Sequence, residues 1–420
     1  MLLKDYYGSD DCCPSVEGSI KLANGSDPFN EDFIKKVFKG ELKDGQIHEG
    51  YYFDVAKKLS EALAQGLNIS TFSIDSPQLK MYEKLKENIF AFSAAKSLTA
   101  LQEYKKALTD ENGNFVSYGQ FRQKVTEVDE WFNDVHLQTE YKSARAMSQM
   151  ADKWERFQKY SHLEYRTVGD SKVRDAHAKL DRLVLETSDP MWDKIWPPND
   201  WNCRCTVVPA QGASVEGRER ADTFSNSKEM KPYFKRNVGK EQTVFKGDHP
   251  YFARLSNEIK KGNLHQFMAE ENYNMPSVEK IYEKGKRPDM KKAGTKEEAF
   301  SQWEKSSKKV KTVDGIEWDL SNQWKHVVQE HATENRWKYI NNVKDVLENT
   351  DEVWSAREIA PNGKERVFKR YVKYYNEKPV IFSYDVDEPD KWTIYDAEVD
   401  ETGKYTKLRN NIRRGVLIKR

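Results

Sequence analysis

Apolar side chains in the N-terminal part of the chain recur every three or four residues, which places them on one face of an α-helix. The first apolar stripe comprises Leu79, Tyr82, Leu85, Ile89 and Phe92. It follows Ser76-Pro77, where serine is a favourable N-cap and proline a favourable first helical residue. Two further stripes run over 121–135 and 141–157, after turn-forming residues at 110–114. We therefore expect a polar arm at residues 1–30 and a mostly helical region over 31–160.

From residue 161 onwards, helical periodicity gives way to short β-like runs at 164–168, 183–185 and 206–208. Tryptophan and proline are unusually dense between the last two runs, at Trp192, Trp196, Pro197, Pro198 and Trp201. Proline cannot extend a helix, and closely spaced indole rings bury large areas, so we expect a rigid, packed loop. Residues 161–212 are predicted to form a small α/β module of their own.

The rest of the chain divides into a polar segment and a segment with predicted helices and strands. Residues 213–300 are rich in lysine and have few regular stretches, so we expect a connector there that wraps other surfaces of the protein. Within residues 301–420, a helix is predicted after Asp319 and another over 337–347. Strands are predicted at 353–357, 366–372, 379–384, 392–395 and 415–418. Asn362-Gly363 and Thr402-Gly403 are hairpin-turn sequences. A helix on a small antiparallel sheet is expected, and the whole chain is predicted to be a multidomain α+β protein.

Composition and charge restrict the functions that the chain can have. Its 420 residues suffice for about two to three domains, and 37% hydrophobic with 12% aromatic residues argue against a disordered protein. The 69 basic and 68 acidic residues nearly cancel, so contact with nucleic acid requires a local patch. Residues 401–420 hold seven basic residues and one acidic residue, and Arg409, Arg413 and Arg414 are the candidate phosphate-binding residues. Apolar runs are too short for a membrane span and the start lacks a secretion signal, so we expect a soluble, intracellular product without membrane contact.

The cysteines form two close pairs, Cys12-Cys13 and Cys203-x-Cys205, which are too few for a disulfide scaffold. Cys203 and Cys205 can both reach one tetrahedral ion, and His177 is a candidate third ligand, so a structural zinc is one interpretation. The alternative is that these groups only pack and hydrogen-bond within the loop. A disulfide between Cys203 and Cys205 is less favoured, because its ring would be strained and the cell interior is reducing.

The order of residues around this loop is specific. It runs Asp170, Val173-Arg174, His177, Pro197-Pro198, Trp201 and Cys203-Arg204-Cys205. With Thr139-Glu140 on the preceding helix, this order resembles the phage Mu F-like minor head protein family, also called the phage head morphogenesis family, over about residues 120–210. Many members carry Cys-x-x-Cys where this chain has Arg174 and His177, and arginine where it has Gln138. The resemblance implies a minor head component of the virion, made in the bacterial host cytoplasm, that assembles with portal, major capsid and scaffold proteins.

The residues after 301 offer the groups that cleave RNA without a metal, namely a base, an acid and cations for the phosphorane charge. Those residues are His326, His331, Lys369, Arg370, Tyr371 and Thr393. The two histidines are five positions apart, which is about 140° around a helix, so they share one site only if the helix bends or begins between them. Each could instead be a hydrogen-bonded core residue.

The spacing His326-x4-His331, the end of the next helix at 346–349 and the later strands resemble the phage-associated nuclease-like domains of the barnase–EndoU–colicin–RelE group, over about residues 310–420. This resemblance implies a ribonuclease that needs no cofactor. His326 or His331 would be the acid or base, and Lys369, Arg370 and Tyr371 would hold a phosphate of host RNA or phage DNA. The leading interpretation is therefore a head-assembly protein with a nuclease-like domain. The alternatives are a toxin-type nuclease effector with a virion carrier region, and a catalytically inactive module that binds nucleic acid or protein.

Overall fold

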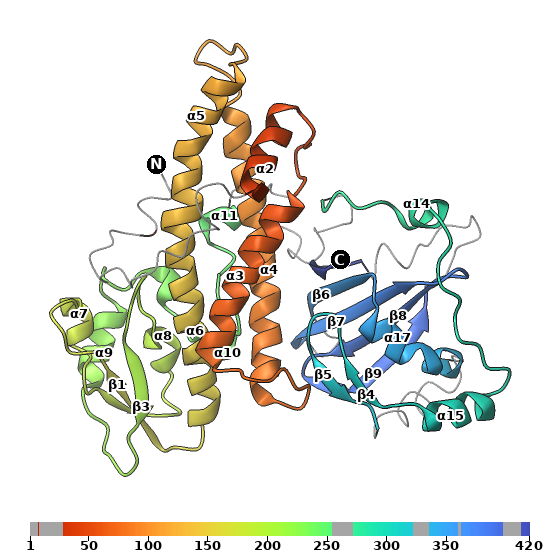
Figure 1. The fold of residues 1–420 in the computed structure, drawn as a ribbon. Coiled ribbons are helices and arrows are strands. Elements are labelled where there is room, and N and C mark those ends of the chain that lie inside the picture. The colour runs from red at the N-terminus through yellow and green to blue at the C-terminus, as the bar shows by residue number, and fades with distance from the viewer. Residues whose placement is uncertain (1–6, 8–27, 254–271, 322–335, 360–362, 398–412) are drawn as a thin grey trace. The chain divides into compact units, whose positions relative to one another are not determined.

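The computed structural model describes Tyr7 and residues 28–253, 272–321, 336–359, 363–397 and 413–420 (Figure 1). Its contacts divide the chain into two compact units. The N-terminal unit comprises residues 1–44, 48–69 and 92–255, and the C-terminal unit comprises residues 45–47, 70–91 and 256–420. The longest helix, α4 (Pro77–Lys106), contributes residues up to Ala91 to the C-terminal unit and the remainder to the N-terminal unit.

The apolar stripes form the predicted helices. α4 begins at Pro77, directly after Ser76, and all five apolar residues of its predicted stripe are buried. The predicted turn at 110–114 is present, because a carboxylate oxygen of Asp110 accepts backbone N–H groups of Asn112 and Asn114. The other long elements of this region are α2 (Pro28–Phe38), α3 (Glu49–Leu67), α5 (Tyr118–Asp129), the π-helix η2 (Glu130–His136) and α6 (Leu137–Phe157). α3 and α6 pack along each other (Figure 1).

A buried ion pair joins α4 to α6 inside the N-terminal unit. Lys96 Nζ lies 2.5 Å from Glu140 Oε2, and both side chains are fully buried. The hydroxyl of Tyr7 donates to the other oxygen of Glu140 at 2.9 Å and contacts Nε2 of His249 at the same distance. Glu140, in the Thr139-Glu140 sequence, is therefore a buried hydrogen-bonding centre of this unit.

The module after α6 contains a three-stranded antiparallel sheet in the order β2-β1-β3. Its elements are β1 (His162–Arg166), α7 (Asp175–Ala178), β2 (Val184–Glu186), α8 (Trp192–Ile195) and β3 (Thr206–Pro209). The indole rings of Trp192, Trp196 and Trp201 are buried, and the Pro197–Pro198 peptide bond is cis. The indole N–H of Trp196 donates to the carbonyl oxygen of Met150 at 3.1 Å, so the loop packs against α6. The packed loop predicted from the sequence is confirmed.

The first half of the expected connector packs on the N-terminal unit. Its elements are α9 (Arg218–Ser225), η3 (Pro232–Phe234), α10 (Val238–Glu241) and α11 (Pro250–Ala253). Aromatic residues anchor them, because Phe224, Tyr233 and Phe245 are buried and Tyr233 stacks on Trp201 with 5.2 Å between ring centroids. These aromatic residues follow no regular spacing, so no period in the sequence indicates that the segment is packed.

The C-terminal unit contains a five-stranded antiparallel sheet in the order β10-β6-β7-β8-β9, which confirms the predicted architecture. Its strands are β6 (Glu352–Ile359), β7 (Glu365–Tyr374), β8 (Pro379–Asp385), β9 (Glu388–Asp396) and β10 (Val416–Lys419). The other elements of the unit are α14 (Val278–Glu283), α15 (Lys296–Lys305), the hairpin of β4 (Lys309–Lys311) and β5 (Glu317–Asp319), η5 (Arg336–Asn342) and α17 (Val343–Glu348). α17 contacts β7 and β8. The helix expected after Asp319, residue 362 of the turn before β7 and the Thr402-Gly403 turn lie outside the described residues.

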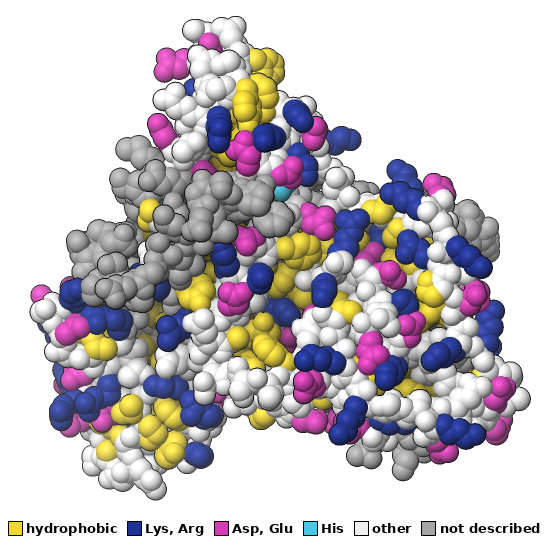
Figure 2. Space-filling view, viewed as in Figure 1, with side chains coloured by type: hydrophobic (Ala, Val, Ile, Leu, Met, Phe, Trp, Pro, Cys, Tyr) yellow, Lys and Arg dark blue, Asp and Glu magenta, His cyan; other side chains and the backbone are white. Residues whose placement is uncertain are grey.

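The surface carries charges of both signs. On the face shown in Figure 2, Lys and Arg side chains are interspersed with Asp and Glu rather than gathered into one basic surface. Among the described residues, no helix combines the length and apolar character needed to cross a bilayer.

Candidate functional site

Three candidate metal ligands converge where α7 meets the loop before β3. Nδ1 of His177 lies 3.6 Å from Sγ of Cys203 and 3.7 Å from Sγ of Cys205. All three donor atoms lie within 4.8 Å of one another. Zinc bonds of about 2.3 Å to sulfur and 2.05 Å to nitrogen at tetrahedral angles separate the two donor atoms by about 3.6 Å. The distances from the imidazole nitrogen to the two sulfurs therefore match those around one tetrahedral ion.

The surroundings of the thiols favour the form that binds metals. Hydrogen bonding with the Cys205 thiol and the proximity of His177 hold the pKa of Cys203 well below its usual range, although its burial acts in the opposite direction. The thiolate is the form that coordinates a metal. A cavity of about 10 Å³ adjoins all three groups and has room for a single ion or water. Among the described residues, no fourth His, Cys, Asp or Glu joins the cluster.

The other motif residues hold the loop that carries the cysteines. Asp170 accepts two hydrogen bonds from Arg204, at 2.6 and 2.8 Å. Nη2 of Arg174 donates to the carbonyl oxygen of Trp201 at 3.1 Å, and its Nε lies 3.4 Å from Asp200. The turn before α7 is thus tied to the loop at two places, which fixes His177 opposite the cysteines.

In the C-terminal unit, the pairing register decides which predicted catalytic residues share a face of the sheet. Arg370 of β7 pairs with Ser383 of β8, and Ser383 pairs with Thr393 of β9. Residues opposite one another on neighbouring strands point to the same face, and successive residues of one strand point to opposite faces. Arg370 and Thr393 therefore share one face, whereas Lys369 and Tyr371 lie on the other. The expectation that Lys369, Arg370 and Tyr371 together hold one phosphate is corrected by this separation.

The face with Arg370 and Thr393 gathers further polar groups. Nη1 of Arg336 donates to Oγ1 of Thr393, and its Cζ lies 5.7 Å from the ring centroid of Tyr395. Arg370 is buried and donates from Nη2 to Glu358 at 2.8 Å, whereas its Nη1 has no hydrogen-bond partner among the described residues. Burial raises the pKa of Tyr395, although Arg370 and Arg336 act against it, so its hydroxyl keeps its proton near neutral pH. We call Arg336, Arg370, Thr393 and Tyr395 the arginine face.

On the opposite face, Lys369 and Tyr371 have structural partners. Lys369 is fully buried and forms ion pairs with Glu83 of α4 and with Asp314, which lies between β4 and β5. The Tyr371 hydroxyl donates to Asp314 at 3.0 Å. A neighbouring pair joins Arg357 to Glu87 at 3.0 Å. These residues neutralise one another inside the unit, which leaves Lys369 no free charge for a phosphate.

Two residues of the predicted basic patch near the C-terminus, Arg413 and Arg414, lie close to carboxylates. Arg413 is buried, with its guanidinium paired to both carboxylate oxygens of Glu352 and to the carbonyl oxygen of Pro276 at 2.9 Å. Arg414 is half-buried, and its Nη1 lies 4.0 Å from Glu358. The predicted site residues His326, His331 and Arg409 lie outside the described residues. Arg336 was not identified from the sequence, because it belongs to no motif and only precedes a predicted helix.

Comparison with known protein families agrees with both resemblances. Residues 54–208 match the family described as Phage Mu protein F like protein, which extends the similarity to α3 and α4. Residues 298–418 match the family described as phage-Barnase-EndoU-ColicinE5/D-RelE like nuclease2. No solved structure has significant similarity to the chain.

Two curated proteins are similar to the N-terminal part. The chain is 35% identical over 109 residues to the Mu-like prophage FluMu F protein of Haemophilus influenzae, which covers 26% of this chain and 24% of that protein. It is 26% identical over 166 residues to the Putative capsid assembly protein F of Escherichia phage Mu, which covers 38% of this chain and 35% of that protein. The chain thus spans about a third or less of each relative. It joins a Phage Mu protein F like region at residues 54–208 to a phage nuclease-like domain at residues 298–418.

Proposed function

We propose that this chain is a phage minor head protein that acts in head assembly at the portal or prohead. The match of residues 54–208 and the likeness to a protein described as a capsid assembly protein support this role. Its partners would be the portal protein and the major capsid or scaffold protein. The buried Trp and Pro loop, tied by Arg174 and Arg204, would hold the exposed residues around it in place for such contacts.

The assembly role is tested on particles rather than on the purified chain. Proheads are isolated from infected or induced cells, and their proteins are identified by mass spectrometry. We expect the chain to sediment with proheads in a fixed ratio to the portal protein. If it stays in the soluble fraction while complete heads form, it is not a head component.

The C-terminal domain is proposed to cleave RNA without a metal, and the unpaired Nη1 of Arg370 carries this proposal. A buried guanidinium N–H without an acceptor is costly, and an anionic phosphate oxygen would satisfy it. Arg336 would share the charge that develops on the phosphorane. The protonated hydroxyl of Tyr395 would donate a hydrogen bond to a phosphate oxygen. His326 and His331 remain the candidates for the acid and the base.

The nuclease assay uses the full chain, 5′-labelled RNA and EDTA. We expect cleavage that falls at least about hundredfold in Arg370→Gln, the scale of losing one transition-state donor. The exposed Arg420 provides the matched control, Arg420→Gln, and should cleave like the wild type. RNA that is retained but not cleaved, still in an Arg370-dependent way, would favour the inactive binding module. Cleavage by a chain that is absent from particles would favour the toxin-type effector.

A structural zinc held by His177, Cys203 and Cys205 is proposed as part of the loop, on the basis of the donor spacing. The ion would add a cross-link between α7 and the loop before β3. Protein purified from zinc-supplemented cells should contain one zinc per chain by elemental analysis, and Cys203→Ser/Cys205→Ser should contain none. The matched control is Cys12→Ser/Cys13→Ser, which should keep its zinc. A wild-type chain without zinc would leave the packing interpretation.

A further inference from the structure

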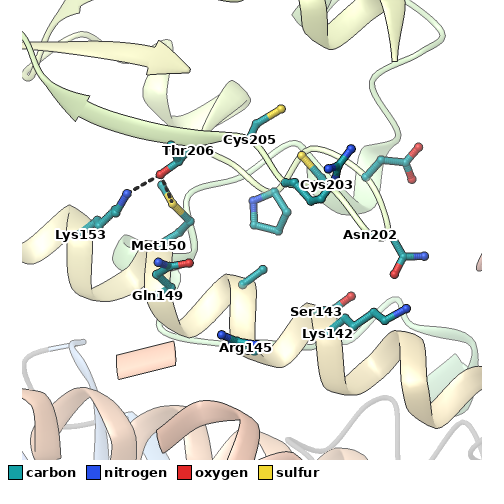
Figure 3. A pocket seen from close by; sticks show the side chains of 14 residues that line it. Lys142, Ser143, Arg145, Gln149, Met150, Lys153, Asn202, Cys203, Cys205 and Thr206 are labelled. Atoms are coloured by element: carbon teal, nitrogen blue, oxygen red, sulfur yellow. Dashed lines mark hydrogen bonds between the residues drawn. The ribbon is translucent and has the colours of Figure 1, made fainter. Parts of the chain in front are cut away.

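A pocket lies between α6 and the loop that precedes β3, within the N-terminal unit (Figure 3). Its volume is about 620 Å³. In Figure 3, side chains of α6 form one wall, and the loop through Asn202, Cys203, Cys205 and Thr206 forms the other. Both walls belong to the region that matches the Phage Mu protein F like family. The pocket is separate from the arginine face of the C-terminal unit.

Three cations of the α6 wall lack a carboxylate partner within the described part of the chain. Lys142, Arg145 and Lys153 line the pocket, and among the described residues no acidic group lies within ion-pair distance of any of them. Lys153 is half-buried and donates only to neutral groups, Oγ1 of Thr206 and the carbonyl oxygen of Val207. Burial, followed by the charge of Arg156, lowers the pKa of Lys153, although the charge of Asp152 acts in the opposite direction.

The remaining charges of the pocket compensate one another. Both carboxylate oxygens of Asp200 are engaged, one by Lys231 at 2.7 Å and the other by Arg174 at 3.4 Å. Arg204 is held by Asp170 through two hydrogen bonds. Among the Lys, Arg, Asp and Glu side chains that line the pocket, the uncompensated charge is therefore positive and comes from α6.

The spacing of the three cations excludes a small anion as the only ligand. From residue 142 to residue 153, α6 rises by about 16 Å, because each helical residue adds about 1.5 Å. A single phosphate or carboxylate cannot reach all three cations. An extended peptide of about five residues covers the same length.

The lining also distinguishes between polymers. Duplex DNA is too wide for a pocket of this size. Single-stranded nucleic acid is normally held by aromatic side chains that stack on its bases, and none of the described residues that line the pocket is aromatic. Ser143, Gln149 and Asn202 instead offer hydroxyl and amide groups that suit a peptide backbone. We propose that this pocket binds an extended acidic segment of a partner protein, with Lys142, Arg145 and Lys153 pairing with its carboxylates.

Fluorescence anisotropy of the full chain with a fluorescein-labelled hexaglutamate peptide tests this proposal. We expect saturable binding that weakens about tenfold or more in Lys142→Gln/Arg145→Gln/Lys153→Gln, because three charge pairs are lost. A matched triple variant, Lys159→Gln/Lys194→Gln/Lys228→Gln, removes the same charge from exposed sites outside the pocket and should bind within about twofold of wild type.

Circular dichroism confirms that both variants are folded before binding is compared. Equal weakening in the two triple variants would show non-specific charge attraction and overturn the site. Absence of binding to the wild type would overturn it as well. If an oligothymidylate of equal charge binds more tightly than the peptide and depends on the same pocket cations, the ligand is single-stranded nucleic acid and the peptide proposal is overturned. None of these outcomes depends on nuclease activity.

Discussion

Replacing Glu83 by Gln should destabilise the C-terminal unit, because it leaves a buried cation without its counter-charge. Lys369 Nζ lies 2.5 Å from Glu83 and also pairs with Asp314, and all three side chains are buried. Lys86 Nζ lies 3.7 Å from both carboxylates. The cluster thus holds two cations and two carboxylates and is neutral. Glu83→Gln changes its volume little and gives it a net positive charge.

The expected magnitude follows from the burial of the cluster. Removing one member of a buried ion pair costs about 3–5 kcal/mol, and the remaining carboxylate of Asp314 places this case near the lower end, about 3 kcal/mol. Native-state hydrogen exchange of the β7 and β8 amides reports the opening of this unit separately. Protection of these amides should fall about hundredfold, because 1.4 kcal/mol corresponds to about one factor of ten.

Two further variants make the test decisive. Glu317→Gln is the matched control, because Glu317 pairs with Lys311 at 3.5 Å with both side chains exposed, and it should cost less than about 0.5 kcal/mol. Glu83→Gln/Lys369→Met returns the cluster to neutrality through Lys86 and Asp314 and should regain most of the lost protection. If Glu83→Gln and Glu317→Gln lose equal protection, charge compensation is not what stabilises this cluster.

Three further predictions rest on buried ionisable groups. A fragment of residues 298–418 lacks Glu83 and its neighbour Glu87. Measured by circular dichroism, this fragment should melt at a lower temperature than the C-terminal unit of the full chain. A peptide of residues 70–91 contains both carboxylates and should stabilise the fragment. Arg413→Gln breaks the buried pair with Glu352 and should reduce exchange protection of β6 by about 3 kcal/mol without changing RNA affinity. Burial lowers the pKa of His136 to about 3, so the unfolded chain binds this proton more tightly. As pH falls from about 6.5 towards 3, His136 should contribute up to about 1.4 kcal/mol per pH unit to the stability that the N-terminal unit loses in urea melts, beside His48 and His249, whose pKa values burial also lowers.

Each of these has its own control. A scrambled 70–91 peptide that stabilises the fragment equally would show non-specific binding. Arg420→Gln serves the second prediction, because Arg420 is exposed, and a loss of RNA affinity confined to Arg413→Gln would restore Arg413 as a nucleic-acid contact. In His136→Gln the acid loss of stability should be shallower, and an unchanged slope would mean that this histidine is not the titrating group.

Local patterns predicted the elements of the fold well, because each element is encoded by its own residues. The stripe after Ser76-Pro77 forms α4, and the short apolar runs form strands of the three-stranded and five-stranded sheets. What the stripe could not predict is that residues 81–101 of α4 are all buried, including charged ones. Glu83 and Lys369 are 286 positions apart in the chain, and no local pattern relates them. Residues 213–253 were expected to wrap other surfaces, but the residues that anchor them could not be predicted, because these aromatic side chains have no period.

The candidate sites differ in how far the sequence specified them. His177, Cys203 and Cys205 are brought together by short turns and one small sheet, so their type and order already indicated a common site. Lys369, Arg370 and Tyr371 are adjacent in the chain, and adjacency in a strand places neighbours on opposite faces.

Strand register, not proximity in sequence, groups Arg370 with Thr393 through Ser383 on β8. The same register places Lys369 on the opposite face, where Glu83 of α4 and Asp314 of the β4–β5 hairpin supply carboxylates. A phosphate on the arginine face would therefore meet Arg370 and Arg336 without disturbing the neutral cluster behind the sheet. Substitutions in that cluster should change the stability of the unit, and substitutions on the arginine face should change its chemistry. A Lys369 variant that abolished RNA cleavage while keeping wild-type exchange protection would contradict this division of the sheet into two faces.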